Sequence, residues 1–420
     1  MGAKPLVLDQ SALSGVAKWG DKASISRAFM RRHAVPCSGL LRTDADFQAL
    51  NDRLQTFIIG SDQVWRWLYT KQYGLLHFLD FVRGDKRKIA VASSFGIDTE
   101  ERPADSARKA GYYLRSFDAV SVREESGLEL LRRHYGVEGE WIADPVFLCG
   151  AECYDELTAD TETPTAPYLL SYVLEPDEKI KQLIEAIASE RGLEVINMVD
   201  AHGDFEKLRA RFGGIGNIAQ GITPEQWVAY IRHCSYFVTD SFHGVCFAHL
   251  FHKDFVCVAP PERGLTRFTS LLGQTGLLRC LLPPDYSAAE LKTATGPIDW
   301  PGVQAVLDAA RTKGCAWLQQ ALAAPRSERA KAQSELLYEL LYAGSGRADR
   351  NRDLETLVQQ QTQRYRHATL PKLIRLKKAV LRLLSLCPIP AVRRRAASRL
   401  RTQQRLAQYL QGEHAPAPRV

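Results

Sequence analysis

The stretch YFVTDSFHG, residues 236–244, sets a polar turn between an apolar run and the start of a helical pattern. Its first three residues are all apolar, as expected of a strand that is covered on both faces. The helix predicted after the turn extends to about Phe251, and the next apolar run, residues 255–258, follows soon after it. A buried strand, a helix and a second buried strand in this order predict a parallel sheet.

Apolar runs of this kind recur along the chain, at residues 57–59, 88–95, 119–122, 141–143, 168–174 and 193–199. Helical patterns lie between or after them, among them residues 124–134, 176–191, 223–234 and 266–272. The expected fold class is therefore α/β, with two consecutive Rossmann-like halves. Ligands of such folds bind at the carboxyl ends of the strands, here in the cleft between the halves.

Composition divides the chain into three parts. Residues 158–167 are rich in Thr, Pro, Asp and Glu, which favours a linker at this point. We expect an N-terminal Rossmann-like domain over residues 1–160, a C-terminal one over residues 161–324, and a helical, basic tail over residues 325–420.

The tail differs from the rest of the chain in charge. Residues 361–420 hold 14 Lys and Arg and one acid, a net charge of +13, which leaves −6 of the total +7 for the first 360 residues. Residues 372–386 are amphipathic at helical spacing. Residues 365–411 therefore suit an anionic membrane surface, or a helix docked on the body with a solvated basic face. Aromatic residues are scarce there, which argues against nucleic acid as a partner.

The cysteines and the start of the chain indicate a compartment. Nine cysteines are scattered from Cys37 to Cys387 without a CxxC pair, as expected of reduced thiols in the cytosol. No apolar run reaches the roughly 18 residues of a membrane span, and the first 21 residues have no apolar centre like that of a secretory signal. We expect a cytoplasmic protein, with peripheral attachment to the inner membrane face through its tail.

The turn after residues 236–238 is the first candidate site. Ser241 to Gly244 open a helix, whose free backbone amides and positive dipole end favour an anion. Gly244 would let a ligand approach the backbone, and His243 would stand beside the anion, able to donate a proton near neutral pH. A buried histidine that caps the turn is an equally good interpretation of the pattern.

Two further strand ends carry polar residues. After residues 57–59 come Ser61, Asp62, Gln63 and Trp65, which suit a sugar, with polar groups for its hydroxyls and an aromatic face for its ring. An Asx-type turn with a core tryptophan is the alternative, and the pattern favours it slightly. Arg123 follows residues 119–122 and could bind phosphate or carboxylate with two donors. On pattern alone, an ion pair with Glu124, Glu125 or Asp144 is the better interpretation of Arg123.

No metal or nucleotide cofactor is expected. His243, Cys246, His249 and His252 lie close in sequence, but no carboxylate completes a ligand set, and Cys246 suits a helix core. The glycine-rich residues 213–216 follow no clear strand and lack the dinucleotide-binding spacing.

Five pieces of sequence, in a fixed order, carry a family resemblance. They are GSDQVW at residues 60–65, ASSFG at 92–96, SVRE at 121–124, DPVF at 144–147 and TDSFHG at 239–244. Together they resemble the polysaccharide pyruvyl transferase family over about residues 50–280. The fold of that family is similar to the GT-B architecture of two Rossmann domains, which agrees with the two halves expected above.

The resemblance implies an activity. A pyruvyl group would pass from phosphoenolpyruvate, bound in the cleft, to hydroxyls of a sugar in a cell-surface polysaccharide or its lipid-linked precursor. The N-terminal domain would hold the acceptor and the C-terminal domain the donor. Arg123 and His243 correspond to the functional pair of the family, and Arg267 matches, less closely, a basic position after the last Rossmann strand.

The chemistry implied needs cations for two anionic groups and a proton for the methylene carbon of the donor. Arg123, Arg267 and the helix end at Gly244 would bind the anion, and His243 would be the general acid or the donor on the phosphate side. Asp62 would orient or deprotonate the acceptor hydroxyl. Further substrate contacts are expected from Ser61, Gln63, Trp65, Ser94 and Ser241. The reaction requires neither a metal nor nicotinamide.

One departure from the family leaves alternatives open. Members begin with a strand and a Gly-Asp loop, and the 56 residues before Phe57 contain no such opening, so the first βα unit is expected to be missing or diverged. An inactive, membrane-associated scaffold is one alternative. A nucleotide-sugar glycosyltransferase of the same architecture is the other, with Glu262 as the candidate carboxylate for the nucleotide.

Overall fold

The computed structural model describes residues 6–9, 25, 28–41, 43–199, 210, 212, 215–258 and 261–342. All of them belong to one compact unit, Met1–Arg347, while Ala348–Val420 form a second unit that includes the basic segment of residues 365–411. The membrane-surface expectation for that segment thus lies outside the described residues. In the described part of the chain, no helix is long and apolar enough to cross a membrane.

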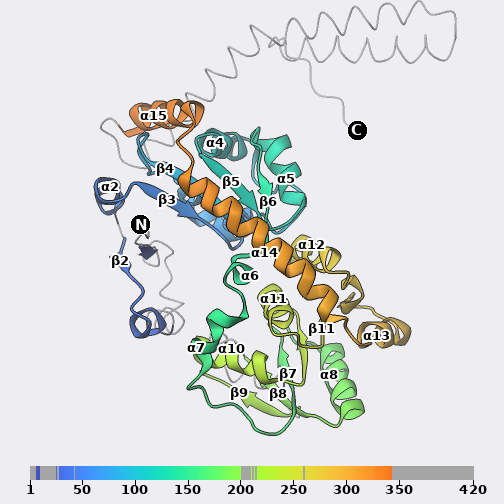
Figure 1. Cartoon of the computed structure of the whole chain (residues 1–420). Helices are drawn as coiled ribbons and strands as arrows, with labels where there is room; N and C mark the ends of the chain where they lie inside the picture. The colour runs from blue at the N-terminus through green and yellow to red at the C-terminus, as the bar shows by residue number, and fades with distance from the viewer. Residues whose placement is uncertain are drawn as a thin grey trace, which may run out of the picture. The chain divides into compact units, whose positions relative to one another are not determined.

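A four-stranded parallel sheet forms the first half of the unit (Figure 1). Its strands pair in chain order and are β3 (Thr56–Ile59), β4 (Arg87–Ser93), β5 (Ala119–Val122) and β6 (Glu140–Trp141). Helix α4 (Ala104–Leu114) follows β4, and α5 (Ser126–Leu130) follows β5. The four apolar runs predicted as strands in this region are confirmed.

A six-stranded parallel sheet forms the second half, in the order β12-β11-β10-β7-β8-β9. Its strands are β7 (Tyr168–Tyr172), β8 (Glu194–Met198), β9 (Asn217–Ala219), β10 (Tyr236–Thr239), β11 (Phe255–Val258) and β12 (Leu281–Leu282). The chain builds outward from β7 to β9, returns to β10 beside β7, and builds outward again. The order therefore reverses between β7 and β10, and the carboxyl end of that junction is where ligands bind in doubly wound sheets.

Helices with strong caps position the second sheet. Asp177 caps α8 (Glu178–Arg191), and Thr223 with Gln226 forms the predicted capping box of α10 (Pro224–His233). Helix α11 (Phe242–Leu250) follows β10 and is buried on nearly every side. Helix α12 (Thr266–Gln274) comes after β11. The helices predicted around these residues are confirmed to within a few residues.

One long helix joins the two cores. Helix α14 (Trp300–Ala323) runs from beside the second sheet to beside the first (Figure 1). Val303 and Leu307, near its start, pack into the core of the second sheet, and Ala321, near its end, packs on Ile89 and Val91 of β4. Helix α15 (Glu328–Tyr342) then packs near α4.

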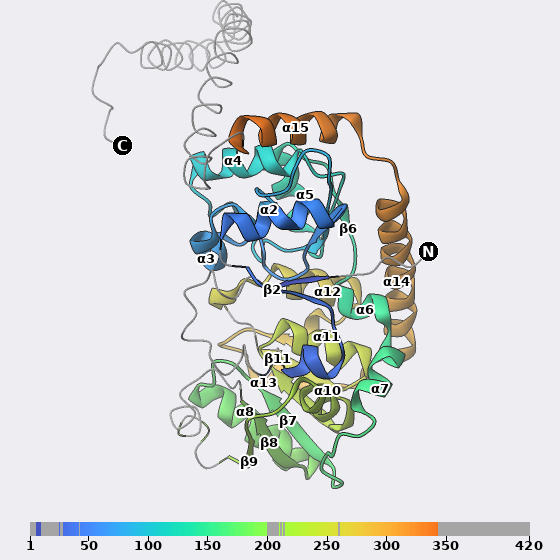
Figure 2. The same ribbon diagram turned by 90° about the vertical axis from the view of Figure 1, so that its left-hand side faces the viewer.

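The N-terminal segment contains two short strands. Among the described residues, β1 (Val7–Asp9) and β2 (Cys37–Leu40) pair in parallel with each other and form a sheet of their own. Figure 2 shows this segment passing from the neighbourhood of α10 to α2 (Asp44–Arg53), which leads into β3. Arg32 accordingly pairs with Glu225 of α10, its Nη2 lying 2.8 Å from Oε1. The described strands before Phe57 thus belong to a separate sheet, and the expectation of a missing or diverged first βα unit stays a prediction.

The fold class stands as α/β with parallel sheets. The expected boundary at residue 160 falls between α7 (Asp155–Thr158) and β7, in a stretch without regular structure. The division into a domain of residues 1–160 and another of residues 161–324, and the GT-B-like description of the pair, remain proposals.

Candidate functional site

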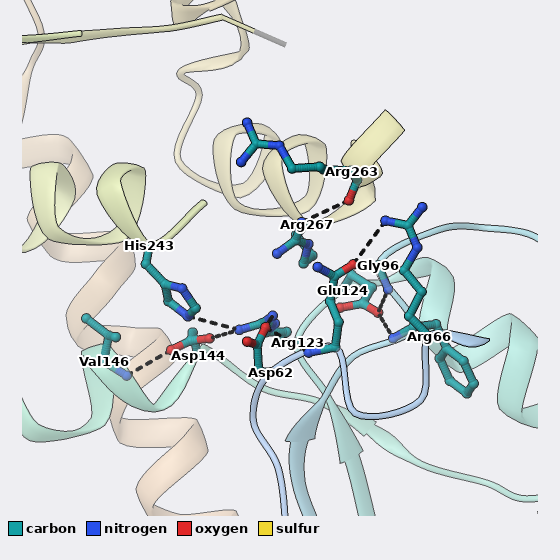
Figure 3. Close-up of polar contacts among 12 residues, drawn as sticks. Asp62, Arg66, Gly96, Arg123, Glu124, Asp144, Val146, His243, Arg263 and Arg267 are labelled. Carbon is teal, nitrogen blue, oxygen red and sulfur yellow. Dashed lines mark hydrogen bonds and ion pairs between the residues drawn. The ribbon is translucent and has the colours of Figure 1, made fainter. Parts of the chain in front are cut away.

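Arg123 and His243 come together although 120 residues separate them. Arg123 follows β5 of the first sheet, and His243 is the second residue of α11, directly after β10 and the point where the second sheet reverses its order. Arg123 Nη1 lies 3.4 Å from His243 Nε2 (Figure 3). The carboxyl ends of strands from the two sheets therefore face one shared site, as the sequence predicted.

Two carboxylates hold Arg123, whose side chain is 0% exposed. Nη1 donates to Asp144 Oδ2 at 2.6 Å, and Nη2 donates to Asp62 Oδ1 at 2.9 Å. Asp144 is itself 2% exposed and caps α6 (Pro145–Cys149) by accepting from the Val146 amide, whereas Asp62 is 68% exposed. The predicted ion pair of Arg123 with Asp144 is thus confirmed. A second carboxylate, that of Asp62, also contacts Arg123 and faces solvent.

These carboxylates keep Arg123 charged. Burial lowers the pKa of Arg123, but the charges of Asp144, Asp62 and Glu124 outweigh burial and raise it above its usual value. For Asp62, burial raises the pKa, and the nearby charges of Arg123 and His243 lower it by more, to a value below 3.8. Both groups are therefore ionised at neutral pH.

His243 is neutral in the free protein. Burial lowers its pKa below 6.5, and of its neighbours Asp144 and Asp62 oppose this shift while Arg123 and Arg267 reinforce it. The contact with Arg123 agrees, because Nη1 can donate to Nε2 only when that nitrogen carries no proton. His243 can therefore donate a proton near neutral pH, as expected, only if a bound anion raises its pKa.

Arg267 is a buried cation without a carboxylate partner among the described residues. It lies in the first turn of α12, is 6% exposed and donates from Nη2 to the Arg263 carbonyl at 3.1 Å. Its guanidinium carbon lies 5.2 Å from the centroid of the Phe242 ring, and that of Arg123 lies 4.8 Å from the same centroid. Burial, followed by the charge of Arg123, lowers the pKa of Arg267 to about 10. A buried positive charge with so little compensation favours an anionic ligand.

Glu124 organises the loop that faces Arg267. Its side chain is fully buried, and Oε1 accepts from the amides of Phe95 and Gly96 at 2.6 and 3.1 Å (Figure 3). Burial is the largest influence on the pKa of Glu124 and raises it above 4.5. The carboxylate thus ties the end of β4 to the end of β5, next to Arg123.

Trp65 is not available to a sugar, contrary to expectation. It is 2% exposed, its ring stacks on Phe78 with centroids 6.0 Å apart, and its Nε1 donates to the His77 carbonyl. The alternative of a turn with a core tryptophan is correct, and Asp62 Oδ1 accepts from the Gln63 amide in that turn. Ser94 is also fully buried. Its carbonyl accepts from the Trp65 amide and so stabilises the turn.

Gly244 and Ser241 are used by the helix itself. Ser241 Oγ accepts from the Gly244 amide at 3.3 Å, as an N-cap does. A Cβ on Gly244 would lie 2.6 Å from Thr239 Oγ1 and 3.2 Å from the Phe237 ring, so packing on β10 by itself requires glycine here. The expected ligand contact through Gly244 stays a prediction.

The remaining expected residues lie at the edge of the site. Ser61 and Gln63 are half-buried, and Gln63 Oε1 accepts from Arg66 Nη1 at 3.3 Å. Arg66 also donates from Nη2 to the carbonyl of Glu262 at 2.9 Å, across from the first half to the second. The side chain of Glu262, the candidate for a nucleotide, carries no contact that supports that role.

Sequence reasoning missed Arg66, Phe242 and Arg263 as parts of this site. Arg263 donates to the Asp240 carbonyl at 3.1 Å and pairs with the Asp240 carboxylate, which keeps the residues after β11 beside the turn after β10. Phe242 could have been found from its place between Ser241 and His243. No local pattern marks Arg66, whose contact with the Glu262 carbonyl connects the two halves, or Arg263, whose partner Asp240 follows a neighbouring strand of the same sheet.

The histidines set aside as metal ligands point to different partners. His249 is fully buried between the Val245 carbonyl and Thr275 Oγ1, while His252 Nε2 lies 2.6 Å from Gln304 Oε1. Burial lowers the pKa of His249 to about 4. Within the described residues, no three His, Cys, Asp or Glu side chains are grouped so that they could hold a metal ion.

Comparison with known families identifies the chain. The model of the polysaccharide pyruvyl transferase family matches residues 23–261, more than half of the sequence. The chain belongs to this family. The match begins before β2 and so includes part of the N-terminal segment in which the sequence offered no recognisable family feature. No curated protein matches the chain.

Solved structures align with most of the chain at low identity. HepE of Anabaena in complex with UDP and glucose is 12% identical, with 76% of this chain and 97% of that chain covered at a TM-score of 0.43. MnaA of S. aureus with UDP is 11% identical, with 79% and 90% covered at 0.44. UDP-GlcNAc 2-epimerase from Neisseria meningitidis bound to UDP-GlcNAc is 11% identical, with 76% and 92% covered at 0.42. The family assignment does not depend on these alignments.

The two carboxylates on Arg123 provide a matched test of stability. Asp144→Asn keeps an oxygen that can cap α6 but leaves Arg123 without its buried counter-charge. We expect a loss of about 3–5 kcal/mol in the free energy of unfolding. Asp62→Asn, at the exposed carboxylate, should cost less than about 1 kcal/mol. Urea denaturation of both variants measures the difference, and equal losses would show that the buried pair does not stabilise the site.

The charge state of His243 can be followed by NMR titration of its ring protons, assigned with His243→Gln. We expect a midpoint below 6.5, moved upward by Arg267→Gln, which removes a cation, and further downward by Asp62→Asn, which removes an anion. Because its folded pKa is depressed, His243 contributes stability that is present above pH 6.5 and is lost as the pH falls toward its folded pKa. A midpoint above 6.5 in the free protein would contradict a neutral imidazole.

Proposed function

We propose that this chain transfers the pyruvyl group of phosphoenolpyruvate to two hydroxyls of a sugar in a cell-surface polysaccharide or its lipid-linked precursor, forming a cyclic ketal. Membership of the polysaccharide pyruvyl transferase family supports the polysaccharide part of this proposal. The observation that carries the donor part is the pair of buried guanidinium groups of Arg123 and Arg267, which share the Phe242 ring beside His243.

The donor brings two anionic groups, a carboxylate and a phosphate. Arg267 has no carboxylate to neutralise it among the described residues, and it binds one of them. Arg123 keeps Asp144 and exchanges the exposed Asp62 for the other anionic group. His243 lies at the start of α11, where the positive end of the helix also favours negative charge.

Binding of the donor prepares both catalytic groups. A phosphate beside His243 raises the pKa of the imidazole, because opposite charge favours the protonated form. Release from Arg123 removes the main cation that lowers the pKa of Asp62, which makes its carboxylate a stronger base. His243 then has a proton to give and Asp62 can accept one.

The bond changes balance as follows. His243 gives its proton to the methylene carbon of the donor, which becomes a methyl group, and a sugar hydroxyl oxygen bonds to the neighbouring carbon while its proton passes to Asp62. The bond between that carbon and the phosphate oxygen breaks with its electrons on phosphate. The second hydroxyl oxygen then bonds to the same carbon and closes the ketal. Of the two hydroxyl protons, one returns to His243 and the other leaves with phosphate.

An assay with phosphoenolpyruvate and candidate lipid-linked sugars tests the proposal. The products are inorganic phosphate and an acceptor that has gained one pyruvyl ketal, detected by mass spectrometry. His243→Ala should lower kcat by 10²–10⁴-fold, which is about what a general acid contributes. Arg267→Gln should weaken donor binding about 100-fold or more, roughly 2.7 kcal/mol or more. Arg132→Gln, at a side chain that is 60% exposed, is the control for loss of an arginine.

Transfer that persists within about tenfold in His243→Ala would exclude the general-acid role. Thermal-shift measurements separate the alternatives. Stabilisation by phosphoenolpyruvate supports the proposal, stabilisation by nucleotide sugars alone indicates a glycosyltransferase, and stabilisation by neither indicates an inactive scaffold.

We also infer, from sequence alone, that residues 365–411 attach the protein to the anionic inner face of a membrane. Their charge and amphipathic pattern support this, and lipid-linked acceptors would be presented there. Removal of residues 365–420 should abolish sedimentation with vesicles that contain anionic lipid, and an equal melting temperature would show that the body remains folded. Unchanged sedimentation would remove the membrane from the list of partners.

A further inference from the structure

Tyr69 is an aromatic side chain that the fold leaves exposed next to the site. It belongs to the short helix α3 (Trp67–Thr70), which begins five residues after Asp62. Of the large hydrophobic side chains that are exposed in the described part of the chain, Tyr69 is the only aromatic one, with 38% of its surface exposed. Packing in the core accounts for Trp65, but nothing in the fold requires the ring of Tyr69 to lie at the surface.

The ring of Tyr69 is held in place from one side. The guanidinium carbon of Arg66 lies 4.8 Å from the ring centroid, in a cation–π contact. Arg66 is 4% exposed and is fixed by Gln63 Oε1 and by the Glu262 carbonyl. Arg66 covers one face of the ring and fixes its position, and 38% of the surface of Tyr69 remains exposed, so that the ring can act as a preorganised platform.

The platform lies at the edge of the anion site. Arg66 is on the far side of Glu124 and Arg267 from His243 (Figure 3). Its partner Glu262 is followed by Arg263, whose carbonyl accepts from Arg267. Arg66, Glu262 and Arg263 thus connect the ring of Tyr69 to Arg267, so that a ligand on Tyr69 would lie at the edge of the anion site.

The surroundings of Tyr69 suit a sugar ring. A pyranose has one face rich in C–H bonds, which packs on an aromatic ring, and hydroxyls around its edge, which need polar partners. Gln63 and Glu101, which is 3.6 Å from Arg66, provide hydrogen-bonding groups.

We propose that Tyr69 is the platform on which the acceptor pyranose stacks during pyruvyl transfer, in the role that the sequence had suggested for Trp65. The inference rests on the proposed function and adds where the acceptor binds. Tyr69 orients the sugar, so that two of its hydroxyls reach the donor carbon, and takes no part in proton transfer.

The experiment compares Tyr69→Ala with Tyr69→Phe, which keeps the ring, and with Leu68→Ala, which removes the exposed neighbour. The probes are the methyl β-glycosides of galactose, glucose and mannose, which carry no aromatic group of their own. Saturation-transfer NMR without phosphoenolpyruvate reports sugar contact, and steady-state transfer kinetics report KM for each substrate. Tyr69→Ala should lose the NMR contact and raise the KM of the acceptor about tenfold or more, or about 1.4 kcal/mol. The KM of Tyr69→Ala for phosphoenolpyruvate should change less than about twofold, well under 1 kcal/mol. Tyr69→Phe and Leu68→Ala should show equally small changes in KM for both substrates.

Unchanged sugar contact in Tyr69→Ala would overturn the platform, as would the absence of contact in the wild-type protein with all three glycosides. A rise in the KM of phosphoenolpyruvate without one for the acceptor would also overturn it, because the ring would then belong to the donor site. Failure of the proposed function would give a different result. If the wild-type protein forms no ketal but Tyr69→Ala loses the NMR contact, pyruvyl transfer is wrong and the sugar platform stands.

Discussion

The buried ion pair of Arg123 and Asp144 is the interaction on which the site depends. Both side chains are almost fully removed from solvent, so that neither charge is tolerable without the other. Asp144 also caps α6, and Arg123 also contacts the Phe242 ring and His243. The end of β5, the segment after β6 and the start of α11 are therefore held together by one charged pair, and every other polar group of the site is arranged around it.

Much of the fold could be predicted because burial leaves a trace in the sequence. Strands such as β4 and β10 are covered on both faces and appear as continuous apolar runs. Strands β9 and β12 were missed, since β9 has exposed or half-buried residues throughout and β12 has only two residues. Trp65 was misjudged for a related reason, because sequence shows that a turn contains a tryptophan but not on which side of the turn its ring lies.

The candidate site was predicted only in part. His243 and Arg123 were recognised from the order of five short motifs, and strand ends alone left both open to ordinary structural interpretations. Arg66 and Arg263 were missed because their partners, the Glu262 carbonyl and Asp240, are distant in the chain. Tyr69 was missed because sequence does not show which aromatic residue the fold leaves exposed. Sequence also could not show that the side chains of Thr239 and Phe237 leave no room for a Cβ at Gly244.

In the proposed reaction, the charges of the site would keep it inactive until the donor binds. In the free protein Asp62 is paired with Arg123 and His243 is neutral, so that neither a free base nor a charged acid faces the solvent. Arg267 is the charge that remains without a carboxylate among the described residues, and it attracts an anion to that place. In the proposed reaction, the anion that satisfies Arg267 also protonates His243 and displaces Asp62. In that reaction, the electrostatic balance of the site would make acid and base available only when there is a donor to use them.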